Sequence, residues 1–149
     1  HNTADDLVVI TAAMLVAFFA TQDDSISILI ASFHGGQIPG WVALVSTPVL
    51  MMLLSVIGIH PVISSAALLA TFSGGGADVH PALLVQAHLI GWGAGTMCSV
   101  ASLSVLTCAG LYRVSSRHLV FGHNLVSGLG YAVIGGGLLV VANLLMGHV

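Results

Sequence analysis

Charged residues are scarce in this chain, and that scarcity limits its fold more than any other feature. Only 5% of the 149 residues are charged, whereas 57% are hydrophobic. An ordinary soluble domain carries about 25% charged residues. Because so little of the sequence can be left in water, we predict an all-α, polytopic integral membrane protein. It should have about four to six membrane segments, several of them broken or re-entrant.

The few charges also limit function and topology. The chain has five Asp, two Arg and a net charge of -3, which argues against nucleic acid as a partner. Arg113 and Arg117 share one short loop, and the positive-inside rule places that loop in the cytoplasm. Asp78 and His148 are then expected on the opposite side. The expected location is a membrane, taken as the bacterial cytoplasmic (inner) membrane, with the lipid bilayer as a partner.

Apolar stretches separated by glycine and proline predict the helices. A helix needs about 20 residues to cross about 30 Å of hydrocarbon, and few stretches here are that long. The expected helical stretches are Leu7 to Thr21, Ile26 to Phe33, Trp41 to Ile57, Val62 to Phe72, Pro81 to Ile90, about Ala101 to Tyr112, and Leu119 to Met146. Pro61 lacks an amide donor and disfavours helix at His60, so the chain should kink or break there. The result is either one long kinked crossing or a span followed by a half-helix that enters the membrane and returns.

The stretch after Ile90 carries the strongest candidate site. Three glycines in Gly91–Gly95 predict a weakened or unwound backbone around residues 91–99, and hydroxyl side chains follow it: Ser99, Ser102, Ser104 and Thr107. Unwound backbone at membrane depth is tolerated where it lines a cavity, and the amides that start the next half-helix attract anions. We therefore expect Gly95, Ser99 and Ser102 to bind a substrate or ion. Helix packing explains the same residues equally well.

Two further sets of polar residues are candidates. Asp23 and Asp24 are flanked by apolar sequence and can form a cation or proton site, or lie in an interfacial loop in water. His60, His88 and His123 can act as proton relays or as ligands to a pigment or metal. A lone histidine is more often a satisfied hydrogen bond between helices. We include His60 among the expected binding residues.

Enzymatic chemistry is not predicted. The sequence supports neither a phosphate-binding loop nor a Ser-His-Asp set, and no two histidines lie at the i, i+4 spacing of a metal site on one helix. Cys98 and Cys108 fit neither a disulfide framework nor a zinc site, so both are interpreted as small core residues. We expect no cofactor, with sodium or proton coupling open. A single histidine as a chlorophyll or haem ligand also stays open.

Three motifs together resemble the C-terminal half of proteins of the ion transporter superfamily. They are Gly58-Ile59-His60-Pro61-Val62-Ile63-Ser64, the Gly91–Gly95 interruption, and Met97-Cys98-Ser99 with the hydroxyl run after it. This group includes divalent-anion/sodium symporters and the membrane subunits of tripartite dicarboxylate transporters. The resemblance covers roughly residues 40–147. Asn2-Thr3 is similar to the Ser-Asn-Thr tip of the symporter hairpins, except that His1 stands at the Ser position.

The resemblance implies inverted repeats, each with a re-entrant hairpin and a broken helix whose tips hold substrate and cations. Since this chain has room for one repeat, we expect residues 1–149 to form a single transmembrane domain, as one repeat or fragment of a larger transporter. The expected function is ion-coupled secondary transport of a small anion, organic anions included, with other membrane subunits or a second repeat as partners. The alternative is a structural transmembrane subunit of a respiratory or photosynthetic complex.

Overall fold

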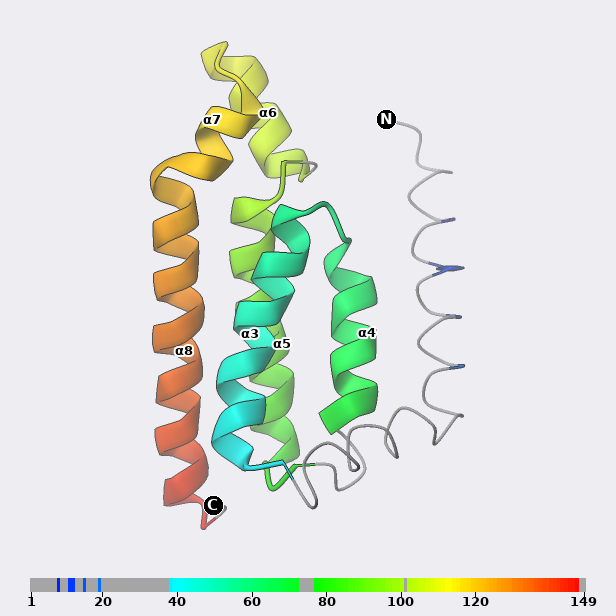
Figure 1. Cartoon of the computed structure of the whole chain (residues 1–149), viewed down its shortest axis with the longest axis vertical. Coiled ribbons are helices and arrows are strands. Elements are labelled where there is room, and N and C mark those ends of the chain that lie inside the picture. The colour runs from blue at the N-terminus through cyan, green and yellow to red at the C-terminus, as the bar shows by residue number, and fades with distance from the viewer. Residues whose placement is uncertain are drawn as a thin grey trace.

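The computed structural model describes residues 8, 11, 12, 15, 19, 38–72, 77–100 and 102–147. These residues form helices, and the one extended pairing among them is an isolated bridge between Ile38 and Ala77. The labels follow Figure 1. The elements are α3 (Gly40–Val56), α4 (Pro61–Phe72), α5 (Pro81–Cys98), α6 (Leu103–Tyr112), α7 (Ser116–Leu119), the π-helical turn η1 (Val120–Asn124) and α8 (Leu125–Leu145).

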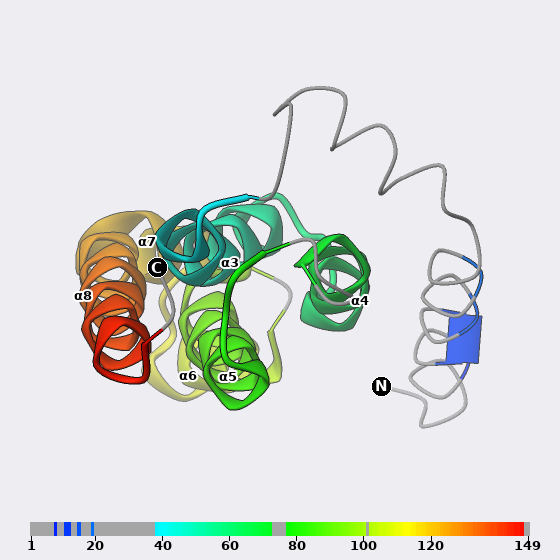
Figure 2. The same cartoon turned by 90° about the horizontal axis from the view of Figure 1, so that it is seen from below.

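Three helices form the frame of the described region. Helices α3 and α5 lie side by side and run in the same direction, and α8 runs antiparallel to both (Figures 1 and 2). Helix α4 folds back along α3 and makes fewer contacts with the frame than the frame helices make with one another. Helix α6 continues beyond the end of α5 and returns through α7 into α8. Helices α4 and α6 therefore lie outside the frame and make few contacts with it.

The predicted break at Gly58–Pro61 is confirmed. Helix α3 ends at Val56, Gly58 adopts a left-handed φ of 92°, and Pro61 begins α4. A positive φ of this kind suits glycine, because glycine has no Cβ. The imidazole of His60 receives the Val62 amide at 3.3 Å, so it caps the new helix. The long kinked crossing is not adopted, because the 12 residues of α4 run back along α3 for about 18 Å, toward the end of the molecule at which α5 begins.

The predicted unwinding at residues 91–99 is wrong. Helix α5 continues through all three glycines to Cys98, and the backbone leaves helical geometry at Ser99 instead. The glycines are packing residues: a Cβ on Gly91 would lie 2.9 Å from the Pro48 Cα, and one on Gly95 would lie 2.6 Å from the Ser55 Oγ. Close approach between α3 and α5 thus explains Gly91 and Gly95. The second helix starts at Leu103 rather than at about Ala101.

The three frame helices cross near Pro48, which lies inside α3. Gly136 of α8 faces the same region, and a Cβ there would lie 2.9 Å from the Leu44 carbonyl oxygen. Proline lacks an amide, so this carbonyl has lost its usual helical donor. Along α8, Gly128, Gly135 and Gly136 contact neighbouring helices, whereas Gly130 and Gly137 face open space. Small residues at such crossings let helix backbones approach closely.

Asn143 connects the end of α8 to the segment before α5. The side chain of Asn143 is only 2% exposed. Its Oδ1 accepts the His80 amide at 3.0 Å, and its Nδ2 donates to the Asp78 carbonyl at 3.1 Å. One amide side chain therefore satisfies two backbone groups at a helix start, where such groups lack helical partners.

Helices α6 and α8 are joined at the far end of the molecule. Arg113 ends α6 in the left-handed conformation, with φ 54°, and the Ser115 hydroxyl caps α7 by accepting the His118 amide at 3.2 Å. In Figure 1 this turn lies opposite the start of α5 and the end of α8. The expected separation of Asp78 from the basic loop agrees with this arrangement, whereas His148 lies outside the described residues.

Two helical segments are long and apolar enough to cross a membrane. They are Pro81–Tyr112, which includes the break between α5 and α6, and Ser116–Leu145. Within their most apolar windows only 29% and 17% of residues are buried. Most of their apolar surface therefore faces outward, unlike that of a core helix in a soluble protein. The shorter apolar helices are α3 and α4.

Candidate functional site

A cavity of about 350 Å³ lies where both helix breaks meet. It is lined by Gly58, Ile59, His60, Pro61, Trp92, Thr96, Ser99, Ser102, Leu103 and Ser104. The first four residues connect α3 to α4, and the last three begin α6. Binding pockets for small molecules have volumes of about 300–1,000 Å³, so this cavity suits a small solute.

Aromatic rings form one wall of the cavity. The imidazole of His60 and the indole of Trp92 meet edge to face, with ring centroids 6.2 Å apart and an interplanar angle of 86°. Because the His60 Nδ1 accepts the Val62 amide, the neutral ring carries its proton on Nε2, which can donate a hydrogen bond. This wall therefore combines an apolar indole with a polar imidazole.

Hydroxyl groups from α5 and α6 form the other wall. The Thr96 hydroxyl donates to the Gly93 carbonyl at 2.9 Å, which leaves its oxygen lone pairs as acceptors. The Ser102 Oγ accepts the Val105 amide at 3.2 Å as the cap of α6, which leaves its hydrogen for donation. Ser99 is only 7% exposed, and its carbonyl accepts the Ser102 amide at 3.2 Å. This wall offers both donors and acceptors.

Four helix ends converge on the cavity. Helices α4 and α6 begin there, and α3 and α5 end beside it. Within the described chain, the amides of Leu103 and Ser104 have no hydrogen-bond partner, as expected for the first turn of a helix. Free amides at helix starts attract anions, and carbonyls at helix ends attract cations. The same cavity thus offers favourable positions for both signs of charge.

The structure brings together three of the six expected binding residues. His60, Ser99 and Ser102 line the cavity, although the chain positions 58–61 and 99–104 are about 40 residues apart. Gly95 does not line it, because its α-carbon faces Ser55 of α3. Asp23 and Asp24 lie outside the described residues.

Sequence reasoning missed Trp92 and Thr96. Both lie on the face of α5 that also carries Ser99, since residues three or four apart share one helix face. Residues 91–99 were expected to be unwound, so the helical spacing of Trp92, Thr96 and Ser99 was not considered. A continuous helix read back from Ser99 identifies positions 96 and 92 at once. Thr107, the last hydroxyl of the expected run, does not line the cavity.

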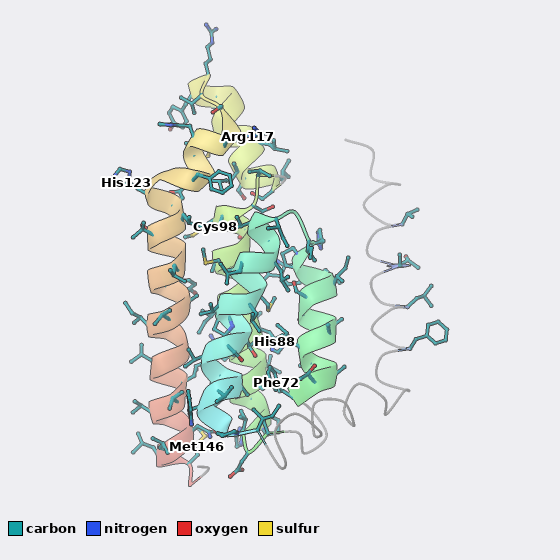
Figure 3. All side chains as sticks on the ribbon, viewed as in Figure 1. Phe72, His88, Cys98, Arg117, His123 and Met146 are labelled. Atoms are coloured by element: carbon teal, nitrogen blue, oxygen red, sulfur yellow. The ribbon has the colours of Figure 1, made fainter. Side chains whose placement is uncertain are left out.

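The remaining candidates lie elsewhere. His88 is buried in α5, whereas His123 is exposed on η1 (Figure 3). Cys98 is a buried core residue as expected, and its Sγ donates to the Asn124 carbonyl at 3.3 Å. The expectation for Cys108 is wrong, because this thiol is exposed on α6, which extends beyond the frame. Across the described positions, no three His, Cys, Asp or Glu residues are grouped to hold a metal ion.

Comparison with known proteins gives no match. No protein-family model fits the chain, and neither curated proteins nor solved structures show significant similarity to it. The geometry of the cavity therefore carries the functional argument.

Proposed function

We propose that this chain is an integral membrane protein whose cavity binds a small anion, with transport coupled to a cation, as one half or one subunit of a secondary transporter. The observation that carries the proposal is the convergence of two helix starts and two helix ends on one polar cavity. Broken helices of this kind bind ions and substrates in secondary transporters, because their exposed amides and carbonyls replace water. The resemblance to the ion transporter superfamily agrees with this reading.

The outward surface supports a membrane location. Large apolar side chains are exposed along α8, among them Val126, Ile134, Leu138 and Leu145. Lipid satisfies such a surface, whereas water does not. Helix α5 has 18 residues and is about 27 Å long, and α6 has 10 residues and is about 15 Å long, so the two in succession fit a bilayer of about 40–45 Å with its headgroups. The break at Ser99–Ser102 then lies well inside the bilayer.

We further propose that α7 and the turn before it face the cytoplasm, because they hold Arg117 and Arg113. A bacterial cytoplasmic membrane is the proposed location. A second repeat or further membrane subunits are the proposed partners, since one repeat provides one half of the superfamily architecture.

One observation favours a structural transmembrane subunit as the second candidate. Helix α5 is continuous through Gly91–Gly95, and its glycines serve helix packing. The cavity distinguishes the two candidates, because a structural subunit has no need of a pocket with free amides. Ligand binding at the cavity therefore decides between them.

The experiment uses Trp92 as a built-in reporter. In a Trp41→Phe variant the emission comes from Trp92 alone, since the chain has two tryptophans. Purified protein in nanodiscs is titrated with succinate and, separately, with sulfate. We expect a saturable change in emission with at least one anion. Ser104→Ala, which removes a hydroxyl from the cavity wall, should weaken binding, whereas Thr107→Ala on the same helix should leave it unchanged.

Uptake of radiolabelled succinate into proteoliposomes completes the test. Saturable binding with uptake supports transport. Emission that stays constant with both anions contradicts the proposed site and favours the structural subunit. Equal weakening by Ser104→Ala and Thr107→Ala also contradicts it, because the effect would then come from α6 as a whole.

A further inference from the structure

His88 is the one buried histidine among the described residues, and only one of its two ring nitrogens has a hydrogen-bond partner within the described chain. Its side chain is 6% exposed and lies among α3, α4 and α5 (Figure 3). The Nδ1 atom is 2.7 Å from the Leu84 carbonyl oxygen, so it must carry a proton and donate. The Nε2 atom is buried and has no hydrogen-bond partner within the described part of the chain. A buried polar atom without a partner is destabilising and calls for an explanation.

Burial disfavours the charged form of the His88 ring, but one neighbour of Nε2 favours a bound proton. The backbone carbonyl of Ser65 in α4 lies beside the ring. With Nδ1 protonated, the Nε2 of a neutral ring is a hydrogen-bond acceptor. It then faces the Ser65 carbonyl, which is also an acceptor. A proton on the Nε2 lone pair gives an imidazolium whose two N–H groups point to the carbonyls of Leu84 and Ser65. Protonation therefore adds a hydrogen bond between α4 and α5.

Apart from His60, which caps α4 and lines the cavity, no other described group near His88 can take this role. Helices α3 and α4 have no ionisable side chain. Helix α5 has Cys98 besides His88, and α8 has Tyr131, whose ring lies beside Gly93 more than one turn farther along α5. The charged form of His88 thus meets no fixed charge of either sign on the described helices around it. An anion bound nearby would provide the compensating charge.

The position of His88 connects it to the cavity. Trp92, Thr96 and Ser99 follow it at i+4, i+8 and i+11, so all four lie on one face of α5. Trp92 is about 6 Å farther along the helix axis. The residues that begin α4, His60 and Pro61, line the same cavity, and Ser65 follows them by one turn. A proton on His88 therefore adds a hydrogen bond between α5 and α4. Helix α4 begins with residues that line the cavity, so this bond holds one wall of the cavity in place.

We propose that His88 is the proton-binding site that couples to anion binding, so that the coupling ion of the proposed transporter is a proton. The inference rests on the proposed function and adds its ion. A proton from water binds the Nε2 lone pair, α4 is held against α5, and the anion in the cavity balances the charge. Release of the proton returns Nε2 to its unpartnered state and loosens that wall.

The test compares succinate affinity at pH 7 and pH 8, where succinate remains a dianion, by Trp92 emission in sodium-free buffer. If each anion binds with one proton, the apparent Kd rises by up to tenfold for each pH unit. We expect this rise in the Trp41→Phe parent and in His123→Gln, whose histidine is exposed. His88→Gln keeps hydrogen-bonding groups but cannot take a proton, and its Kd should change less than twofold.

The outcomes separate the two proposals. An equal pH dependence in His88→Gln and in the parent overturns the role of His88 while anion binding stands. A pH-independent parent does the same. No succinate binding in any variant overturns the proposed function, and the coupling role with it. If His88→Gln fails to fold, nitrogen NMR of histidine-labelled parent decides: Nε2 should bind a proton more readily with succinate present, and an unchanged titration contradicts the proposal.

Discussion

Replacing Gly91 by alanine tests whether the α5 glycines serve packing. A Cβ at this position would lie 2.9 Å from the Cβ and Sδ atoms of Met51 and 2.9 Å from the Pro48 Cα. The methionine sulfur can move, but the proline backbone is held within α3. Gly130 is the matched control, because it lies inside α8 and a Cβ there meets nothing within 4 Å.

The two substitutions share one effect and differ in the other. Alanine raises helix propensity over glycine by about 1 kcal/mol at both positions. Only Gly91→Ala adds a steric conflict, and overpacking of this kind costs about 1–3 kcal/mol. The difference between the variants therefore isolates the conflict. With about 2–4 °C per kcal/mol for a chain of this size, Gly91→Ala should melt about 2–12 °C below Gly130→Ala.

Thermal unfolding of both variants in the same detergent measures this difference, with circular dichroism as the signal. Equal melting temperatures would refute close packing between α3 and α5 at Gly91. A Gly91→Ala variant that melts normally but loses anion binding would show that Gly91 matters for the cavity rather than for packing.

Three further predictions follow from single contacts. Ser102→Ala removes the cap of α6 and should lower stability by about 1 kcal/mol, whereas Ser102→Gly should cost a few tenths, measured by thermal melts; equal losses would contradict the cap. Asn143→Ala removes two hydrogen bonds and should lower the free energy of unfolding by about 1–3 kcal/mol in the same assay. The control Asn124→Ala, at an exposed position, should be near neutral. Similar losses in both variants would contradict the anchoring role of Asn143. A Val114→Cys variant with Cys108→Ala should resist a membrane-impermeant maleimide in intact cells and react after permeabilisation, and efficient labelling of intact cells would reverse the proposed topology.

The sequence predicts most of the helices because apolar length and proline leave local signals. Pro61 marks the start of α4, and the stretch Trp41 to Ile57 agrees with α3 within one residue at each end. Glycine is the ambiguous signal. It weakens an isolated helix, yet it also lets two helices approach closely, and only the partner helix decides which effect prevails. For Gly91 and Gly95 that partner is α3, which the sequence alone does not place.

The candidate site was predictable in part for a similar reason. Ser99 and Ser102 follow a change in local pattern that a single sequence shows. Their neighbour His60 comes from a separate break, and its place beside Trp92 depends on α3 and α5 running side by side in the same direction. Such long-range pairing follows from tertiary packing rather than from local propensity.

Helix α5 carries two adjacent faces with different roles. Gly91 and Gly95 turn toward α3, while Trp92 and Thr96 turn toward the cavity about 100° farther around the helix. Each cavity residue thus directly follows a packing glycine in sequence but does not share its contacts. A substitution at position 92 or 96 can therefore change the lining of the cavity without disturbing the junction with α3. The shape of the cavity can vary while the helical frame stays the same.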